Sequence, residues 1–399
     1  MSRILAVWEM GANMGHIDRL LLTGRALRKR GHQVRFVLRD LSRAHPRIAA
    51  EGFFMGQAPV WLPTLANPPR LGNYSAVLAA AGWLDATGLA GLISGWQAWF
   101  DLLQPDALIC DHAPTALLAA RGQGLNVWTV GSSFEVPPRA PHFPPMAHWD
   151  PAEAARCAGY DGLLLPVANQ ALALHGRPPL GRLTEVFDDT QRALVTLPEL
   201  AHYTGYSADT EFSGPAYLGD SGVAPQWPAT TGPKVLVYLS PSHPEFRRVL
   251  AGLSEAGMVG LVHAKGLSAE AALRLGGPHL RFEAQPVRMD EALAQADLVV
   301  AHGGLGTATA AMLAGRPQLA LVTQMEQHMV GRRIEAAGVG LVVLPGAAAP
   351  DWRALLQRLW REPRFAESAR RVAARHAGRT ALATGERLAD LIEASLAPA

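Results

Sequence analysis

The first 38 residues contain a strand, a glycine-bearing turn, an amphipathic helix and a second strand. Residues 4–8 are continuously apolar, and apolar residues then recur at helical spacing over 17–27. Gly31 is suited to the end of that helix, and residues 33–38 form the second strand. Because two strands joined by a helix lie parallel in a sheet, this unit restricts the chain to an α/β fold.

The same alternation recurs further along the chain. Strands are predicted at 107–110, 127–130, 234–239, 259–263, 297–301 and 319–322. Helices are predicted at 115–121, at 245–256, from the glycine-rich turn after 301 to Ala314, at 328–337 and from Trp352 onward. The stretch 212–232 carries several Pro and Gly residues and is predicted to be a linker. We therefore expect two doubly wound α/β domains, 1–215 and 233–375, with ligands bound in the cleft between them, beyond the carboxyl ends of the strands.

Composition narrows the class of protein. The 399 residues are 49% hydrophobic and 18% charged, which is typical of globular domains rather than disorder. A formal charge of +2 gives no electrostatic footprint for nucleic acid or an anionic membrane surface. Two cysteines, Cys110 and Cys157, disfavour a disulfide framework or a structural zinc site. The apolar stretches 4–8 and 89–100 are too short for an export signal or a membrane span, so we expect a cytoplasmic protein.

The strongest local signal is the sequence Ala-His-Gly-Gly-Leu-Gly-Thr-Ala-Thr at 301–309, where a predicted strand runs through a glycine-rich turn into a helix. Unpaired N–H groups at a helix start bind anions, and glycine lets a phosphate approach the backbone closely. The alternative is a tight turn that packs helix on strand. The chain lacks the G-x-x-x-x-G-K-[ST], G-x-G-x-x-G and G-x-S-x-G motifs, which disfavours a P-loop, a nicotinamide cofactor and a nucleophile elbow.

Two motifs, one in each half, resemble a known family. Residues 298–340 contain Leu-Val-Val-Ala-His-Gly-Gly-Leu-Gly-Thr, Leu-Ala-Gly-Arg-Pro, Met-Glu-Gln and Ala-Ala-Gly-Val-Gly. This segment is similar to the donor-binding segment of GT-B glycosyltransferases of the macrolide and UDP-glucuronosyl type (family 1), which are related to MurG-like enzymes. Met-Gly-His at 14–16 and Arg-Gly-His-Gln-Val at 30–34 resemble the opening of the same family. Residues 40–105 and 140–210 carry no such resemblance.

The resemblance implies a GT-B fold of two Rossmann-like domains. The N-terminal domain would bind the acceptor, the C-terminal domain would bind the nucleotide sugar, and residues 376–399 would pack back on the N-terminal domain. His16 would be the base that takes a proton from an acceptor hydroxyl, and Asp111 would orient it. Without the resemblance, a structural or surface role for His16 and a helix-cap role for Asp111 are the simpler interpretations.

The resemblance also assigns the donor site. The expected donor-binding residues are His302, Gly303, Gly304, Gly306 and Thr307 for the diphosphate, and Glu326 and Gln327 for the sugar hydroxyls. The family's usual Pro before the Glu-Gln pair, its Asn after it and its acidic residue for the ribose are all missing here. The resemblance therefore favours uridine diphosphate as the nucleotide without fixing its identity. No separate cofactor is expected.

No metal is expected. The chain has no strict Asp-x-Asp motif, and His112, His142 and His148 do not match a known ligand spacing.

The predicted function is metal-independent, inverting transfer of a sugar from a nucleotide sugar to a small hydroxylated acceptor. A sugar-nucleotide epimerase of the same fold and a non-catalytic nucleotide-sugar-binding accessory protein are the alternatives. The aromatic residues Trp83, Trp96, Trp99 and Phe100 could line an apolar acceptor pocket, but their helical spacing favours the core.

Overall fold

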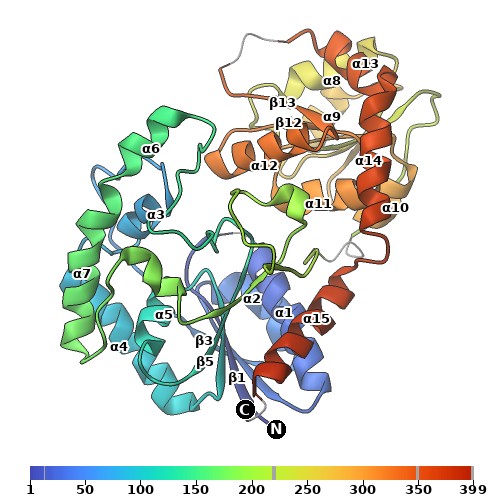
Figure 1. Ribbon diagram of the computed structural model, residues 1–399. Coiled ribbons are helices and arrows are strands. Elements are labelled where there is room, and N and C mark those ends of the chain that lie inside the picture. Colours follow the sequence, from blue (N-terminus) through green and yellow to red (C-terminus); the bar gives the residue numbers. More distant parts are fainter. Residues whose placement is uncertain (13, 218–221, 347–349, 397–399) are drawn as a thin grey trace. The chain divides into compact units, whose positions relative to one another are not determined.

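The structure is a computed structural model that describes residues 1–12, 14–217, 222–346 and 350–396. It divides into two compact units (Figure 1). The first comprises Met1–Thr196, Ala201–Ala216 and Thr380–Ala399, and the second comprises Leu197–Leu200 and Tyr217–Arg379.

The first unit is built on a parallel sheet of seven strands in the order β3-β2-β1-β4-β5-β6-β7. The strands are β1 (Arg3–Trp8), β2 (Gln33–Leu38), β3 (Phe54–Gln57), β4 (Ala107–Asp111), β5 (Asn126–Gly131), β6 (Gln191–Leu194) and β7 (Glu211–Phe212). The central strands are apolar on both sides, as a sheet covered on both faces requires.

Helices cover both faces of this sheet. Alternate residues of β1 separate two hydrophobic clusters: Leu5 and Val7 pack with α3, α4, α5 and α7, while Ile4, Ala6 and Trp8 pack with α1, α2 and α15 (Figure 1). The helices and 3-10 turns of the unit are α1 (Met14–Lys29), α2 (Leu41–Ile48), η1 (Ala49–Glu51), α3 (Tyr74–Ala80), α4 (Ala86–Leu103), α5 (Pro114–Ala120), α6 (Pro151–Cys157), α7 (Tyr160–Leu174), η2 (Leu183–Phe187) and α15 (Ala381–Leu396).

The C-terminal helix α15 packs along α1. Gly385 lies so close to α1 that a Cβ there would be 2.9 Å from the carbonyl oxygen of Leu22. Arg30, just after α1, donates to Glu386 and Glu393 of α15 at 2.7 Å each. The last helix is thus held to the first by close backbone packing and by charge.

The second unit has a parallel six-stranded sheet in the order β10-β9-β8-β11-β12-β13. Its strands are β8 (Lys234–Tyr238), β9 (Val259–His263), β10 (Leu280–Glu283), β11 (Leu298–Ala301), β12 (Gln318–Leu321) and β13 (Gly340–Val343). Its helices are α8 (Phe246–Glu255), α9 (Ala269–Leu275), α10 (Met289–Gln295), α11 (Leu305–Leu313), α12 (Met325–Ala336), α13 (Trp352–Arg361) and α14 (Pro363–Arg375), and the turn η3 (Pro198–Leu200) packs beside α12.

These elements confirm the predicted α/β class with two doubly wound sheets. The main difference in the predicted elements is at α12, which begins at Met325 rather than at 328. The side chains of Gln324 and Gln327 form a capping box that starts the helix one turn earlier. Trp83, just before α4, and Trp96 and Phe100 on α4 lie in the core, as their spacing favoured, and Trp99 is partly buried against that core. Among the described residues, no helix has both the length and the apolar character needed to cross a membrane.

Candidate functional site

The first candidate site lies at the carboxyl ends of β1 and β4, two neighbouring parallel strands. Their register pairs Trp8 with Asp111, so both strands end at the same edge of the sheet. Because α1 begins at Met14, His16 lies in its first turn. The structure brings the two predicted residues together: His16 Nδ1 is 2.8 Å from Asp111 Oδ1, and both side chains are buried.

Arg19, one turn after His16 on α1, binds the same carboxylate. Its Nε donates to Asp111 Oδ2 and its Nη2 donates to Oδ1, each at 2.8 Å, in a bidentate ion pair. Nη2 also lies 3.0 Å from His16 Nδ1. With Oδ1 as the common acceptor of both nitrogens, the neutral imidazole carries its proton on Nδ1. The lone pair of Nε2 then remains available to accept a proton.

Two further contacts fix the plane of the His16 ring. Trp8 stacks on it with a centroid distance of 5.2 Å and an angle of 18° between the planes. Gly11, in the loop between β1 and α1, has φ of +85°, and a Cβ there would lie 2.5 Å from His16 Nε2. Glycine is the residue that both adopts this backbone conformation and leaves room for the ring.

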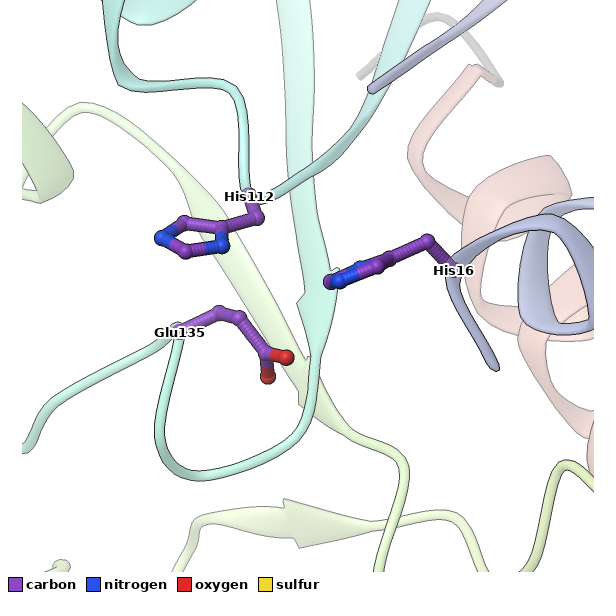
Figure 2. Close-up of side chains that lie close together, drawn as sticks. All are labelled: His16, His112 and Glu135. Carbon is purple, nitrogen blue, oxygen red and sulfur yellow. The ribbon is translucent and has the colours of Figure 1, made fainter. Parts of the chain in front are cut away.

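Glu135 and His112 complete the surroundings of His16. Figure 2 shows the imidazole of His16 pointing toward the space between these two side chains. Glu135 follows β5 and lies with one oxygen 3.4 Å from Arg19 Nη2, while the other accepts from the Ser132 hydroxyl. Burial opposes ionisation of Glu135, but the charge of Arg19, the charges that His16 and His112 carry when protonated, and the hydrogen bond from Ser132 outweigh it and hold the pKa of Glu135 well below its usual value.

His112 stays neutral at this position. It follows Asp111 directly, with φ of +46°. Burial lowers the pKa of His112 to about 4, although the charge of Glu135 acts in the opposite direction. Its Nε2 is buried, and in the described part of the chain it has no hydrogen-bond partner.

One atom of each of His16, His112 and Glu135 lies within 4.8 Å of the others, and this donor set suits a transition metal. However, Arg19 already places a buried positive charge on Glu135 and beside His16. This charge and the Asp111 bond of His16 disfavour a cation here.

The second candidate site follows β11 in the second unit. The chain turns at Gly303, with φ of +78°, where a Cβ would lie 3.2 Å from Val322 and 3.3 Å from the carbonyl oxygen of Gln327. Gly304 is the N-cap of α11 and supplies no side-chain cap. A Cβ on Gly304 would meet no atom within 4 Å. The first turn of α11 therefore presents backbone N–H groups beside open space, which suits an anion.

His302 adds a side-chain donor to this turn. Its Nε2 accepts from the Ser240 backbone N–H at 2.8 Å, so the neutral ring carries its proton on Nδ1. Nδ1 is buried and has no partner among the residues that the structure describes. Burial lowers the pKa of His302, and the charge of His243 acts in the same direction. The ring is thus a neutral imidazole with an unused N–H donor.

The other predicted donor residues lie on α11 and α12. Gly306 and Thr307 are in the first turn of α11, and a Cβ on Gly306 would also meet open space. Glu326 and Gln327 are in the first turn of α12. Gln327 has a structural role as well, because its Oε1 accepts from Thr323 N and Oγ1 and from Gln324 N at 2.9–3.2 Å.

Comparisons with known proteins agree with this architecture. Residues 272–384 match the family described as erythromycin biosynthesis protein CIII-like, C-terminal domain. The chain is similar to the crystal structure of the glycotransferase of kitacinnamycin, with a TM-score of 0.73 and 20% identity over 99% of both chains. It is also similar to glycosyltransferase VinC in complex with DTDP, with a TM-score of 0.69 and 19% identity over 98% of this chain and 100% of VinC. The chain has a GT-B fold, and residues 272–384 match the EryCIII-like family model.

This GT-B assignment confirms the resemblance drawn from the two sequence motifs. Among curated relatives, the chain is 26% identical over 260 residues to the PGL/p-HBAD biosynthesis rhamnosyltransferase of Mycobacterium bovis, which is 61% of this chain and 57% of that protein. It is 37% identical over 121 residues to the elloramycin glycosyltransferase ElmGT of Streptomyces olivaceus, 28% of this chain and 30% of that protein. The chain thus spans little more than half the length of the rhamnosyltransferase.

Two residues of the first site, Arg19 and Glu135, were not predicted from the sequence. The spacing of Arg19, three residues after His16, places both on the same face of the helix, but it does not show that Arg19 is buried. Glu135 has no such signal, because it reaches the site from a Pro-rich loop after β5. His142, which lies near His112 in the sequence, instead has its Nδ1 3.4 Å from Asp161 Oδ2.

Glu9, directly after β1, is a buried carboxyl group outside the His16 cluster. It accepts from the Thr115 backbone N–H and from Trp96 Nε1 at 2.9 Å each. Burial raises the pKa of Glu9 to about 7, and these hydrogen bonds only partly oppose that effect. The folded protein therefore binds this proton more tightly than the unfolded chain does.

We expect Glu9 to make stability depend on pH. Its contribution is fully present below the unfolded pKa of 4.5 and is lost as pH rises through about 7. The free energy of unfolding should fall by on the order of 3 kcal/mol at most between these values. Urea unfolding of the wild type and Glu9→Gln at pH 5 and pH 8 measures this. The variant should show less pH dependence, and equal dependence in both proteins would contradict the prediction.

Proposed function

We propose that the chain transfers a sugar from a nucleotide sugar to a hydroxyl group of a small acceptor. The observation that carries the proposal is the buried His16–Asp111 pair, which leaves one imidazole nitrogen able to take a proton. The uncapped glycine turn before α11 supplies a matching anion site in the second unit. The names of the relatives, a rhamnosyltransferase and an antibiotic glycosyltransferase, support the same reaction class.

In the proposed step, the acceptor hydroxyl gives its proton to His16 Nε2 while its oxygen bonds to the anomeric carbon of the sugar. The bond between that carbon and the diphosphate oxygen breaks, and the electron pair leaves with the diphosphate. A single displacement of this kind inverts the anomeric centre. Asp111, bound to the opposite ring nitrogen, holds the tautomer and stabilises the imidazolium that forms.

The leaving diphosphate would be held at the start of α11. Negative charge grows on it as the glycosidic bond breaks, and fixed donors aimed at that charge lower the barrier. The donors proposed are the backbone N–H groups at Gly304 and Gly306, the Thr307 hydroxyl and the unused His302 Nδ1–H. Glu326 with Gln327 would bind the sugar hydroxyls.

The nucleotide is proposed to be a pyrimidine nucleoside diphosphate, with UDP as the first candidate. dTDP is the second, because VinC was solved with DTDP and the spinosyn rhamnosyltransferase SpnG with thymidine diphosphate.

The direct test is product analysis. The protein is incubated with UDP- and dTDP-hexoses and a panel of phenolic and aliphatic alcohols, and the products are identified by mass and by NMR of the anomeric proton. We expect an acceptor heavier by one sugar, release of the nucleoside diphosphate and an inverted anomeric configuration. Retention would overturn the single displacement. Conversion of the nucleotide sugar to an isomer would instead support the epimerase alternative.

Sugar transfer is expected to survive chelation. In this proposal the diphosphate is held by backbone N–H groups and neutral side-chain donors. Beside His16, the guanidinium of Arg19 already supplies the positive charge that a metal cation would bring. Initial rates after EDTA treatment and desalting should stay within about twofold of the untreated rate. Strict dependence on added Mg²⁺, Mn²⁺ or Zn²⁺ would contradict both arguments.

A further inference from the structure

His16 belongs to a buried cluster of four ionisable side chains. The other three are Arg19, Asp111 and Glu135, and none of the four side chains is more than 10% exposed. Water therefore screens their charges poorly, and a proton gained by His16 must be compensated by the other members. The geometry of the four groups decides how this happens.

Arg19 removes most of the stabilisation that Asp111 alone would give to a protonated His16. Its guanidinium binds both carboxylate oxygens at 2.8 Å, so most of the charge of Asp111 is already balanced. Its Nη2 also lies 3.0 Å from His16 Nδ1. An imidazolium at His16 would therefore face a cation at hydrogen-bond distance. Without another negative charge, proton uptake by His16 would leave a net positive charge in the buried cluster.

Glu135 supplies that charge. Its carboxylate lies 3.4 Å from Arg19 Nη2 and is turned toward His16 (Figure 2). The Ser132 hydroxyl donates to its second oxygen. With Asp111 and Glu135 negative and Arg19 positive, the cluster holds a net charge of minus one while His16 is neutral, and zero once His16 is protonated.

The other groups that face His16 do not alter this count. His112 is neutral because burial lowers its pKa to about 4. Tyr74, which packs on His112, is neutral because burial raises its pKa well above 10. Trp8, stacked on His16, carries no charge. The carboxyl group of Glu9 is turned to Trp96 and Thr115 instead.

We propose that Glu135 is a positioning residue that gives the buried cluster the negative charge it needs for His16 to accept the acceptor's proton. This inference rests on the proposed function for its catalytic meaning. The charge balance itself can be measured without any substrate.

Three variants separate charge from packing. Glu135→Gln keeps the shape but raises the charge of the cluster by one unit. Arg19→Gln lowers it by one unit. The double variant Glu135→Gln/Arg19→Gln restores the original count. Glu135→Asp, which keeps the charge and changes the shape, is the matched control.

The readout is the pH midpoint of the His16 imidazole signals in two-dimensional NMR, assigned by their loss in His16→Ala. Relative to wild type, we expect the midpoint to fall by about one pH unit or more in Glu135→Gln and to rise by a similar amount in Arg19→Gln. It should return to within about half a unit of wild type in the double variant. Glu135→Asp should stay close to wild type.

An unchanged midpoint in Glu135→Gln would overturn the inference, as would equal shifts in Glu135→Gln and Glu135→Asp. If Arg19→Gln fails to fold, the two Glu135 variants still decide. In the transfer assay, kcat of Glu135→Gln should fall at least tenfold while stabilisation by nucleotide stays unchanged. The predicted NMR shifts without transfer activity in the wild type would instead mean that the proposed function fails and the charge balance holds.

Discussion

Replacing His16 with alanine is expected to lower kcat for sugar transfer by about 10²- to 10⁴-fold, the usual contribution of a positioned general base. The imidazole is the group that would take the acceptor's proton, and its removal leaves the donor turn of the second unit untouched. Stabilisation by the nucleotide should therefore be the same in His16→Ala and the wild type. Steady-state rates and thermal melts with and without UDP measure the two effects.

The fold should tolerate this change. In His16→Ala the carboxylate of Asp111 keeps both bonds to Arg19, so no buried charge loses its partner. Asp111→Ala is a poorer test, because it would leave the buried guanidinium of Arg19 without its main ion-pair partner. Gly11→Ala offers a second probe, because its Cβ would press on Nε2 while the imidazole remains. Turnover in His16→Ala equal to that of the wild type would remove His16 as the base.

The fold was predictable because its central strands are short apolar runs followed by glycine turns and amphipathic helices. The strands β1, β4 and β11 begin and end within one residue of the predicted bounds. The strands β3, β6, β7, β10 and β13 were not predicted. The sequence of β3, Phe-Met-Gly-Gln, is partly exposed and has neither an apolar run nor a clear alternation. Tertiary pairing with β2 makes it a strand.

The candidate site was only half predictable for a related reason. Asp111 ends an apolar strand and His16 lies at the start of a helix that follows another, so their place at the edge of a parallel sheet follows from the sequence. Arg19 looks like a surface residue of an amphipathic helix, and only the fold shows that it is buried with two carboxylates. The spacing of Glu135 from Asp111 reflects a loop whose course no local pattern determines.

The second large effect is expected at Gly304. UDP at a hundredfold excess over its dissociation constant should stabilise the wild type by about 2.7 kcal/mol. Gly304→Val places a side chain in the open space at the N-cap of α11, where the diphosphate would approach the backbone. The variant should fold, since a Cβ there meets no atom within 4 Å, yet it should lose the stabilisation.

Gly159→Val is the matched control for that experiment. Gly159 is also the N-cap of a helix, α7 in the first unit, and a Cβ there likewise meets no atom within 4 Å. Gly159→Val should keep the full stabilisation by UDP.

Glu326→Ala should also keep this stabilisation, because UDP lacks the sugar. It should instead weaken discrimination between donor sugars, since a site built to bind a hydroxyl leaves its polar groups unpaired when a sugar lacks that hydroxyl. Thermal melts of the four proteins with UDP and dTDP give the answer. No stabilisation of the wild type by either nucleotide would argue against a nucleotide-sugar donor, and an equal effect in Gly304→Val would place the phosphate elsewhere.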